Sequence, residues 1–135
     1  MDLTEQNISE VTPHIIGLLD EWKLTPEQIF RLLGLEGQLG SRDLRKLRTK
    51  SASLPYSTEL AERIEHIVGI VGALQTAYPR NAEMRTLWLY QPLRRFDKAT
   101  PMAVMLKDNL DGLIKVRIEV DCAYGWSLND QQPDK

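Results

Sequence analysis

Apolar side chains recur at spacings of three and four along most of this chain, which is the period of a helix with one buried face. The clearest case follows Leu54-Pro55-Tyr56, where Ser57 is placed to cap a long helix that ends before Pro79. No run alternates apolar and polar side chains for long enough to predict a strand. The pattern therefore predicts an all-α fold. The apolar positions of the long helix are Leu60, Ile64, Ile67, Val68, Val71, Leu74 and Tyr78.

Two glycines interrupt the long helix. Gly69 and Gly72 each lower its helix propensity by about 1 kcal/mol relative to alanine. We interpret them as points where another helix approaches closely. The opposite, polar side of the long helix is expected to hold Arg63 and His66 in solvent.

Three Thr-Pro pairs, at Thr12-Pro13, Thr25-Pro26 and Thr100-Pro101, predict helix starts. In each pair the threonine can accept a hydrogen bond from an unpaired backbone N–H, and the proline occupies the first helical position, where no N–H is needed. Gln28 completes a capping box with Thr25, and Gly34 is expected to end that helix in the left-handed conformation. Besides the long helix, we expect helices over residues 13–22, 26–33, 41–50 with Ser41 as its cap, 82–90, 101–107 and 110–124.

The last expected helix, 110–124, should have one buried and one charged side. Its solvent-facing side is expected to carry two ion pairs between residues four apart, Asp111–Lys115 and Arg117–Asp121. Its buried side is expected to hold Leu110, Leu113, Ile114 and Ile118.

The composition, with 42% hydrophobic and 27% charged residues in a chain of 135, is that of a soluble globular protein. The longest apolar-rich stretch, 64–78, is interrupted by polar side chains, so no membrane span is expected. The first residues lack the basic and apolar regions of a signal peptide. The single cysteine, Cys122, cannot form an intramolecular disulfide, which suits a reducing compartment. We expect a cytoplasmic protein.

Charge is distributed unevenly along the chain, although its net value is only −2. Residues 1–40 carry two positive and seven negative side chains, for a net charge of −5, whereas residues 41–50 carry five positive and one negative, for +4. A capped helix, a glycine-containing connector and this basic helix match the layout of a helix-turn-helix. Arginine and lysine would neutralise phosphates there, and arginine can read guanine edges. The candidate DNA-binding residues are Ser41, Arg42, Arg45, Lys46, Arg48 and Lys50.

Two alternatives for the basic helix stay open. One is that its charged face is simply solvated, and the other is that it meets an acidic protein partner. The connector 35–40 is several residues longer than the usual turn of a helix-turn-helix, which leaves the angle between the two helices undetermined.

Groups suited to catalysis are few. His14 and His66 lie far apart and in no metal-ligand pattern, and Cys122 has no neighbouring histidine to activate it. The glycines at 34, 37 and 40 follow a helix, whereas a phosphate-binding glycine loop follows a strand. We therefore expect no enzyme, no cofactor and no metal site. An interaction role is more consistent with Arg94, Arg95 and Phe96 in a turn and with Trp126 near the C-terminus, although each of these could also be core or solvated.

Several short segments between residues 24 and 125 carry a further signal in their order and spacing. They are Leu54-Pro55, Glu62 to Ile70, Ala73-Leu74, Tyr78-Pro79-Arg80-Asn81, Trp88-Leu89, Pro92, Arg95-Phe96, Pro101, Val104-Met105-Leu106 and Gly112 to Arg117. Together they resemble the linking helix and the C-terminal toxin-binding domain of the Xre/MbcA/ParS antitoxin family.

The resemblance implies a type II antitoxin that occludes a RES-domain toxin, an enzyme that consumes NAD. It further implies a dimer or larger homo-oligomer that represses its own operon by binding operator DNA through residues 41–50. The implied parts are a helix-turn-helix region (1–54), a linking helix (55–79), a toxin-binding domain (80–126) and a flexible tail (127–135), which would lie at the toxin's cleft. The implied toxin-binding residues are Arg94, Arg95, Phe96, Arg117, Asp121, Tyr124, Trp126, Ser127 and Asn129.

This chain departs from the family's pattern after Arg95-Phe96. The family usually has glycines there, whereas this chain has Asp97-Lys98. A turn with positive φ would be strained at these positions, although aspartate tolerates positive φ better than most residues. The alternative function is that of a stand-alone helix-turn-helix regulator without a toxin.

Overall fold

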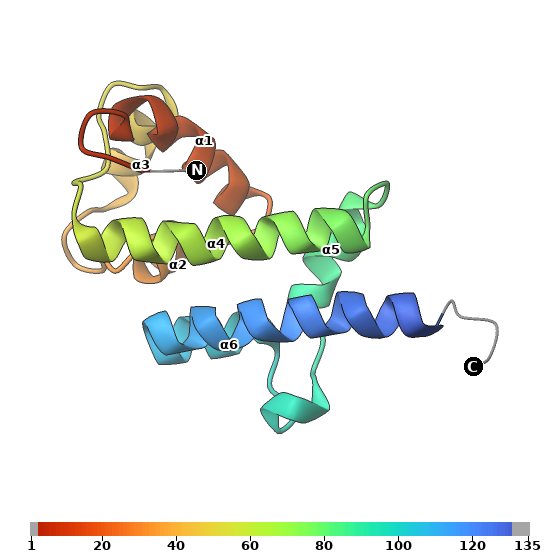
Figure 1. The fold of residues 1–135 in the computed structure, drawn as a ribbon. Helices are drawn as coiled ribbons and strands as arrows, with labels where there is room; N and C mark the ends of the chain where they lie inside the picture. Colours follow the sequence, from red (N-terminus) through yellow and green to blue (C-terminus); the bar gives the residue numbers. More distant parts are fainter. Residues whose placement is uncertain (1–2, 131–135) are drawn as a thin grey trace. The chain divides into compact units, whose positions relative to one another are not determined.

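The computed structural model describes the backbone of residues 3–130 and the side chains of residues 3–122. The described residues form α-helices and one short 3-10 helix, without a strand, so the predicted all-α fold is confirmed (Figure 1). The chain divides into two compact units, Met1–Glu65 and His66–Lys135. The elements are α1 (Ile8–Asp20), α2 (Pro26–Leu32), α3 (Ser41–Arg48), α4 (Thr58–Ala77), α5 (Ala82–Leu89), η1 (Arg94–Phe96) and α6 (Pro101–Asp130).

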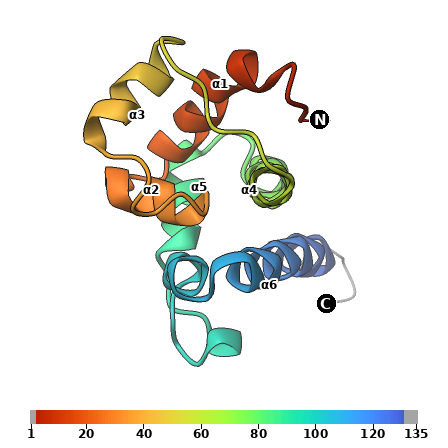
Figure 2. The same cartoon turned by 90° about the vertical axis from the view of Figure 1, so that its left-hand side faces the viewer.

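In the N-terminal unit, α3 packs against both α1 and α2 (Figure 2). The first helix begins earlier than predicted, at Ile8, because Ile8 extends its buried face by about one and a half turns before Pro13. The predicted start at Thr12-Pro13 is therefore wrong, and Pro13 lies inside α1. The core of this unit is formed by Ile15, Ile16, Leu19, Trp22, Ile29, Phe30, Leu32, Leu33, Leu44, Leu47, Leu54, Leu60 and Ile64.

Thr12 has a different role from the predicted helix cap. Its fully buried hydroxyl donates to the carbonyl oxygen of Ile8 (2.6 Å) and accepts from the backbone N–H of Leu54 (3.1 Å). A buried N–H without a partner costs free energy, and Leu54 lies in a connection that offers its N–H no helical acceptor. Thr12 therefore fastens the segment before α4 to α1.

The predicted ends of α2 are confirmed. The backbone N–H of Gln28 donates to Thr25 Oγ1 (3.2 Å), and that of Thr25 donates to Gln28 Oε1 (2.9 Å), which completes the capping box. Gly34 has φ +75°, as a left-handed helix end requires. The predicted cap of α3 is wrong by one residue: the N-cap is Gly40, whose N–H donates to the Asp43 carboxylate (2.8 Å).

The long helix α4 begins as predicted, with the N–H of Leu60 donating to Ser57 Oγ (3.0 Å). Arg63, however, is buried rather than solvated. Its guanidinium pairs with Glu59 (3.2 Å) and donates to the carbonyl oxygen of Leu32 at the end of α2 (3.3 Å). A cation at this place is favourable because the last carbonyls of a helix carry partial negative charge.

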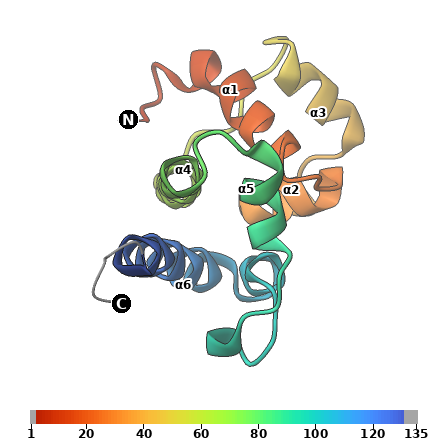
Figure 3. The ribbon, with the colours of Figure 1, turned by 90° about the vertical axis from the view of Figure 1, so that its right-hand side faces the viewer.

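In the C-terminal unit, α5 contacts α6 (Figure 3). The two helices predicted at 101–107 and 110–124 form α6, which is interrupted at Asn109 by non-helical angles (φ 54°, ψ −128°). Gly112 follows this kink, and a Cβ there would overlap the carbonyl oxygen of Val104. Residues 127–130 of the predicted tail lie within α6, and residues 131–135 lie outside the described residues.

The buried face of α6 differs from the predicted one. Leu113 is buried, but Ile118 is 59% exposed, so its predicted burial is wrong. The reason is that Val116 and Val120, together with Leu113, form the inner face, and Ile118 lies on the other side of the helix.

We predict that Thr12→Val lowers the free energy of unfolding by about 1–3 kcal/mol, because the N–H of Leu54 loses its acceptor in a buried place. Urea unfolding followed by circular dichroism measures the change. Thr12→Ser is the matched control, since it keeps the hydroxyl, and it should lose less. Equal losses in both variants would mean that packing of the methyl group, and not the hydrogen bond, is what Thr12 contributes.

Candidate functional site

The basic helix α3 has two distinct faces. Leu44 and Leu47 are almost fully buried against the N-terminal unit, which turns the positions between them outward. All six candidate DNA-binding side chains are accordingly exposed, namely Ser41, Arg42, Arg45, Lys46, Arg48 and Lys50.

Arg48 differs from the other cations because it is engaged within the unit. Its Nε and Nη2 atoms donate to the two carboxylate oxygens of Asp20, at 2.9 and 2.8 Å. These hydrogen bonds raise the pKa of Arg48, although partial burial opposes the shift. A bidentate pair of this kind holds the end of α3 against the end of α1, so Arg48 positions the basic helix and is partly neutralised. The sequence offered no signal for this pair, because Asp20 lies 28 residues away.

The long connector between α2 and α3 is an ordered turn. The N–H of Leu35 donates to the carbonyl oxygen of Phe30 (2.7 Å), and that of Gln38 donates to the carbonyl oxygen of Leu35 (3.0 Å). Leu35 is itself buried, and Gly37 has φ +82°. A small hollow of about 290 Å³ lies between α2 and this connector. Residues 25–50 thus contain two short helices, α2 and α3, joined by an ordered connector.

The second candidate surface is the turn that contains η1. The N–H of Leu93 donates to the carbonyl oxygen of Ala99 (3.1 Å), and that of Lys98 donates to the carbonyl oxygen of Leu93 (2.9 Å), which closes the turn. Asp97 and Lys98 both have positive φ, 53° and 71°. The left-handed conformation costs an L-residue other than glycine roughly 1–2 kcal/mol, less for aspartate. Asp97 and Lys98 therefore both adopt the conformation that glycine favours.

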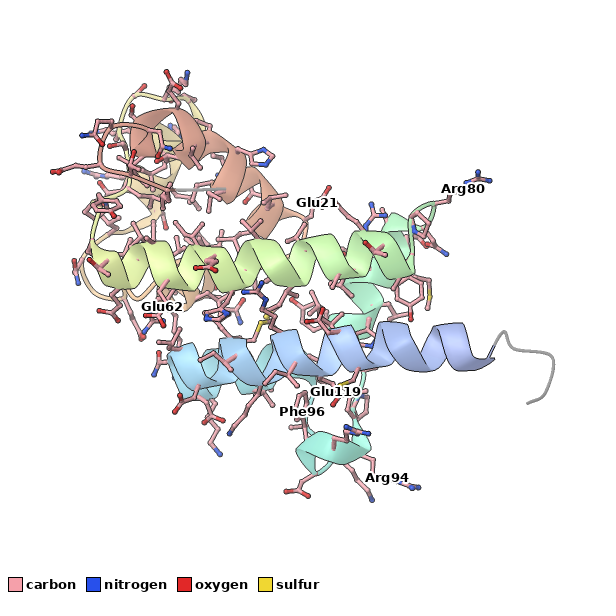
Figure 4. The ribbon with its side chains drawn as sticks, in the orientation of Figure 1. Glu21, Glu62, Arg80, Arg94, Phe96 and Glu119 are labelled. Carbon is pink, nitrogen blue, oxygen red and sulfur yellow. The ribbon has the colours of Figure 1, made fainter. Side chains whose placement is uncertain are left out.

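A groove of about 550 Å³ lies between this turn and α6. Phe96 points from η1 toward α6, whereas Arg94 points away from it (Figure 4). Arg95 Nε lies 3.9 Å from Glu119 Oε1 across the groove. The groove is lined by Arg95, Phe96, Asp97, Ala99, Ala103, Val104, Lys107, Asp108, Lys115, Ile118 and Glu119. It combines an apolar floor with a rim that carries both signs of charge.

Arg117 lies away from this groove. Its Nη1 atom is 3.1 Å from Nδ1 of His66 on α4, and its guanidinium lies over Gly69. The expected close approach at Gly69 is therefore made by a side chain of α6, since a Cβ at Gly69 would lie 2.5 Å from Arg117 Nε. Gly72 has nothing within 4 Å of such a Cβ. His66, expected in solvent, is half-buried.

The remaining predicted interface residues lie in the last part of α6. Asp121 is exposed. The other four are placed only by the backbone of α6, and their side chains lie outside the described residues: Tyr124, Trp126, Ser127 and Asn129. The ion pair of Lys115 joins it to Asp108 (3.5 Å), on the far side of the kink, in place of the expected Asp111.

Among the side chains that the structure describes, those of residues 3–122, no cluster of histidine, cysteine and acidic groups is arranged to hold a metal ion. None of the described helices is long and apolar enough to cross a membrane. No protein-family model, no curated protein and no solved structure matches this chain.

We predict opposite outcomes for the two glycines of α4. Gly72→Ala should raise the free energy of unfolding by about 0.5–1 kcal/mol, because it improves helix propensity at no steric cost. Gly69→Ala should gain nothing, because the new methyl group displaces the Arg117 guanidinium from His66. Urea unfolding of both variants, repeated in an Arg117→Ala background, separates the two effects. In that background Gly69→Ala should raise the free energy of unfolding as Gly72→Ala does. If the effect of Gly69→Ala is the same in both backgrounds, Arg117 is excluded as its cause.

Proposed function

We propose that this chain is an antitoxin that binds a RES-domain toxin through its C-terminal unit and occludes it sterically. Its N-terminal unit would bind operator DNA through α3 and so repress its own operon. The proposal starts from the ordered segments that resemble the Xre/MbcA/ParS family. The observation that carries it is the conformation of the turn after Arg95-Phe96.

That turn supports the proposal in two ways. The resemblance expects glycines, and hence positive φ, after Phe96, and positive φ is what Asp97 and Lys98 adopt. Among the described residues, this is the one place where two successive residues other than glycine have positive φ. Strain of this kind persists where the surrounding structure enforces it, and it is common at binding sites.

The surroundings of the turn favour a protein partner. Arg94 projects outward, and the groove beside the turn is open, partly apolar and bordered by charged side chains. Arginine and aromatic side chains are enriched among the residues that dominate binding energy at protein interfaces. A toxin surface that covered Arg94, Phe96 and the end of α6 would be blocked by simple occupancy, with no chemistry supplied by this chain.

The basic face of α3 favours the second activity, and it is also the observation behind the alternative of a stand-alone regulator. Arg42, Arg45 and Lys46 project from one short helix whose apolar face is fixed by the core, and Lys50 lies in the turn just beyond its end. Such a helix can approach phosphates without rearranging the unit. Because Asp20 holds Arg48, the other cations would contribute most of the contact with DNA.

We predict that Arg94→Ala/Arg95→Ala weakens binding of the RES-domain protein encoded beside this chain by about tenfold or more, since central arginines at interfaces each contribute on the order of 1 kcal/mol or more. Calorimetry gives the affinity, and rescue of growth on co-expression gives the neutralisation. Arg42→Ala/Arg45→Ala is the charge-matched control and should bind the toxin normally. Deletion of residues 127–135 should likewise weaken neutralisation. Full rescue by both altered C-terminal forms would overturn the toxin-binding assignment.

A separate prediction concerns DNA from the region upstream of the gene. Arg42→Ala/Arg45→Ala should abolish most binding and flatten its salt dependence, by about 0.9 in logarithmic slope for each phosphate that α3 no longer neutralises. Arg48→Ala should cost less than Arg45→Ala, because Asp20 already occupies Arg48. Fluorescence anisotropy at several salt concentrations measures both quantities, with Arg94→Ala/Arg95→Ala as the control. DNA binding without toxin binding would favour the stand-alone regulator.

A further inference from the structure

The carboxylate of Glu119 lines the groove beside η1 and, within the described part of the chain, accepts no hydrogen bond. Its side chain is only 15% exposed. The ion pair that it forms with Arg95 joins Nε to Oε1 at 3.9 Å, which is longer than a hydrogen bond. Because a carboxylate that is largely removed from water is costly without a donor, Glu119 is suited to accept hydrogen bonds from a cation that enters the groove.

The turn that contains η1 adds an aromatic ring to the same groove. Phe96 points from η1 toward α6, and Phe96 and Glu119 both line the space of about 550 Å³ (Figure 4). The lining also includes the apolar side chains of Ala99, Ala103 and Val104. An aromatic ring attracts a cation to its face, and this attraction is stronger where water is partly excluded. The ring and the carboxylate therefore favour the same kind of ligand group.

The chemistry of these two groups selects a guanidinium on a protein surface. A guanidinium donates two parallel hydrogen bonds to one carboxylate, and its flat face stacks on an aromatic ring. A free polyamine is disfavoured, because Arg95, Lys107 and Lys115 are exposed around the groove and repel further positive charges on a ligand. An arginine side chain brings a single charge into the groove. The rest of a protein surface can then meet the rim, where the exposed Asp97 adds a negative charge to these cations.

We propose that Phe96 and Glu119 form a binding site for one arginine side chain of a protein partner. In the free chain Arg95 lies near Glu119, and it moves aside when the partner's arginine binds. This exchange costs little, because the Arg95 side chain is 57% exposed and exposed ion pairs contribute little to stability. That the toxin supplies the arginine rests on the proposed function, whereas the preference of the groove for a guanidinium does not.

The first experiment titrates the full chain with N-acetyl-arginine amide over the millimolar range and follows the backbone amides by NMR spectroscopy. The shifts should centre on Phe96 and Glu119. Glu119→Gln should weaken binding by about tenfold, since it removes the charge at nearly constant size. Phe96→Leu should weaken it by about two- to fivefold, and Arg95→Ala should strengthen it by removing the competing guanidinium. Equal binding by wild type and Glu119→Gln, or shifts centred elsewhere, would overturn the proposal.

Two controls accompany this titration. Asp111→Asn removes one exposed carboxylate from α6 outside the groove and should bind the probe as wild type does. Circular dichroism and urea unfolding establish that each variant is folded. A parallel titration uses spermidine in place of the arginine probe. If spermidine binds in the groove more tightly than N-acetyl-arginine amide, the groove is a site for free polyamines and the assignment to a protein's arginine is wrong.

The second experiment measures binding of the RES-domain protein by calorimetry. Glu119→Gln should weaken this binding by about tenfold or more, because the partner's arginine loses its carboxylate, and Asp111→Asn should leave it unchanged. If the toxin binds wild type and Glu119→Gln equally, the toxin does not supply the arginine, and this inference fails while the proposed function stands. If the arginine probe occupies the groove but wild type does not bind the toxin, the proposed function fails and the arginine site stands.

Discussion

The contact between Arg117 and α4 decides which side of α6 is available to a partner. The guanidinium lies over Gly69 and reaches His66, while Leu113 and Val116 pack inward on the neighbouring face. With α6 held in this rotation about its axis, Ile118 faces outward, because Arg117 and Ile118 lie about 100° apart around the helix. The absence of a side chain at Gly69 of α4 therefore determines which residues of α6 form its outward surface.

Features that depend on neighbours in sequence could be predicted well. The predicted caps at Thr25, Ser57 and Thr100 all form, and each accepts from a backbone N–H three residues ahead. The local signal failed at Thr12, where burial of Ile8 favoured an earlier helix start. Cap energies are on the order of 1 kcal/mol, so they set helix ends only where tertiary packing does not oppose them.

Long polar side chains were the main source of error, because their partners are distant in sequence. Arg63 reaches the end of α2, 31 residues away, and Arg117 reaches His66, 51 residues away. Periodicity assigns a charged residue to the solvent side, yet both arginines lie against the protein. The same limitation affects the candidate sites: the basic helix was identified correctly as a charged surface, but the neutralisation of Arg48 by Asp20 was not foreseeable from composition.

The turn at Asp97-Lys98 has a consequence for the thermodynamics of recognition. The backbone of Leu93 forms two hydrogen bonds, with Ala99 and with Lys98, and these hold the turn in one conformation before any partner binds. A loop that is already ordered loses little conformational entropy on binding, so more of the contact energy appears as affinity. Glycine at either position would relieve the torsional cost and widen the range of conformations of the unbound loop. The unit would then become more stable, whereas the unbound loop would be less well ordered for binding. Lysine at position 98 has the opposite effect, because it costs stability but keeps the loop ordered for binding.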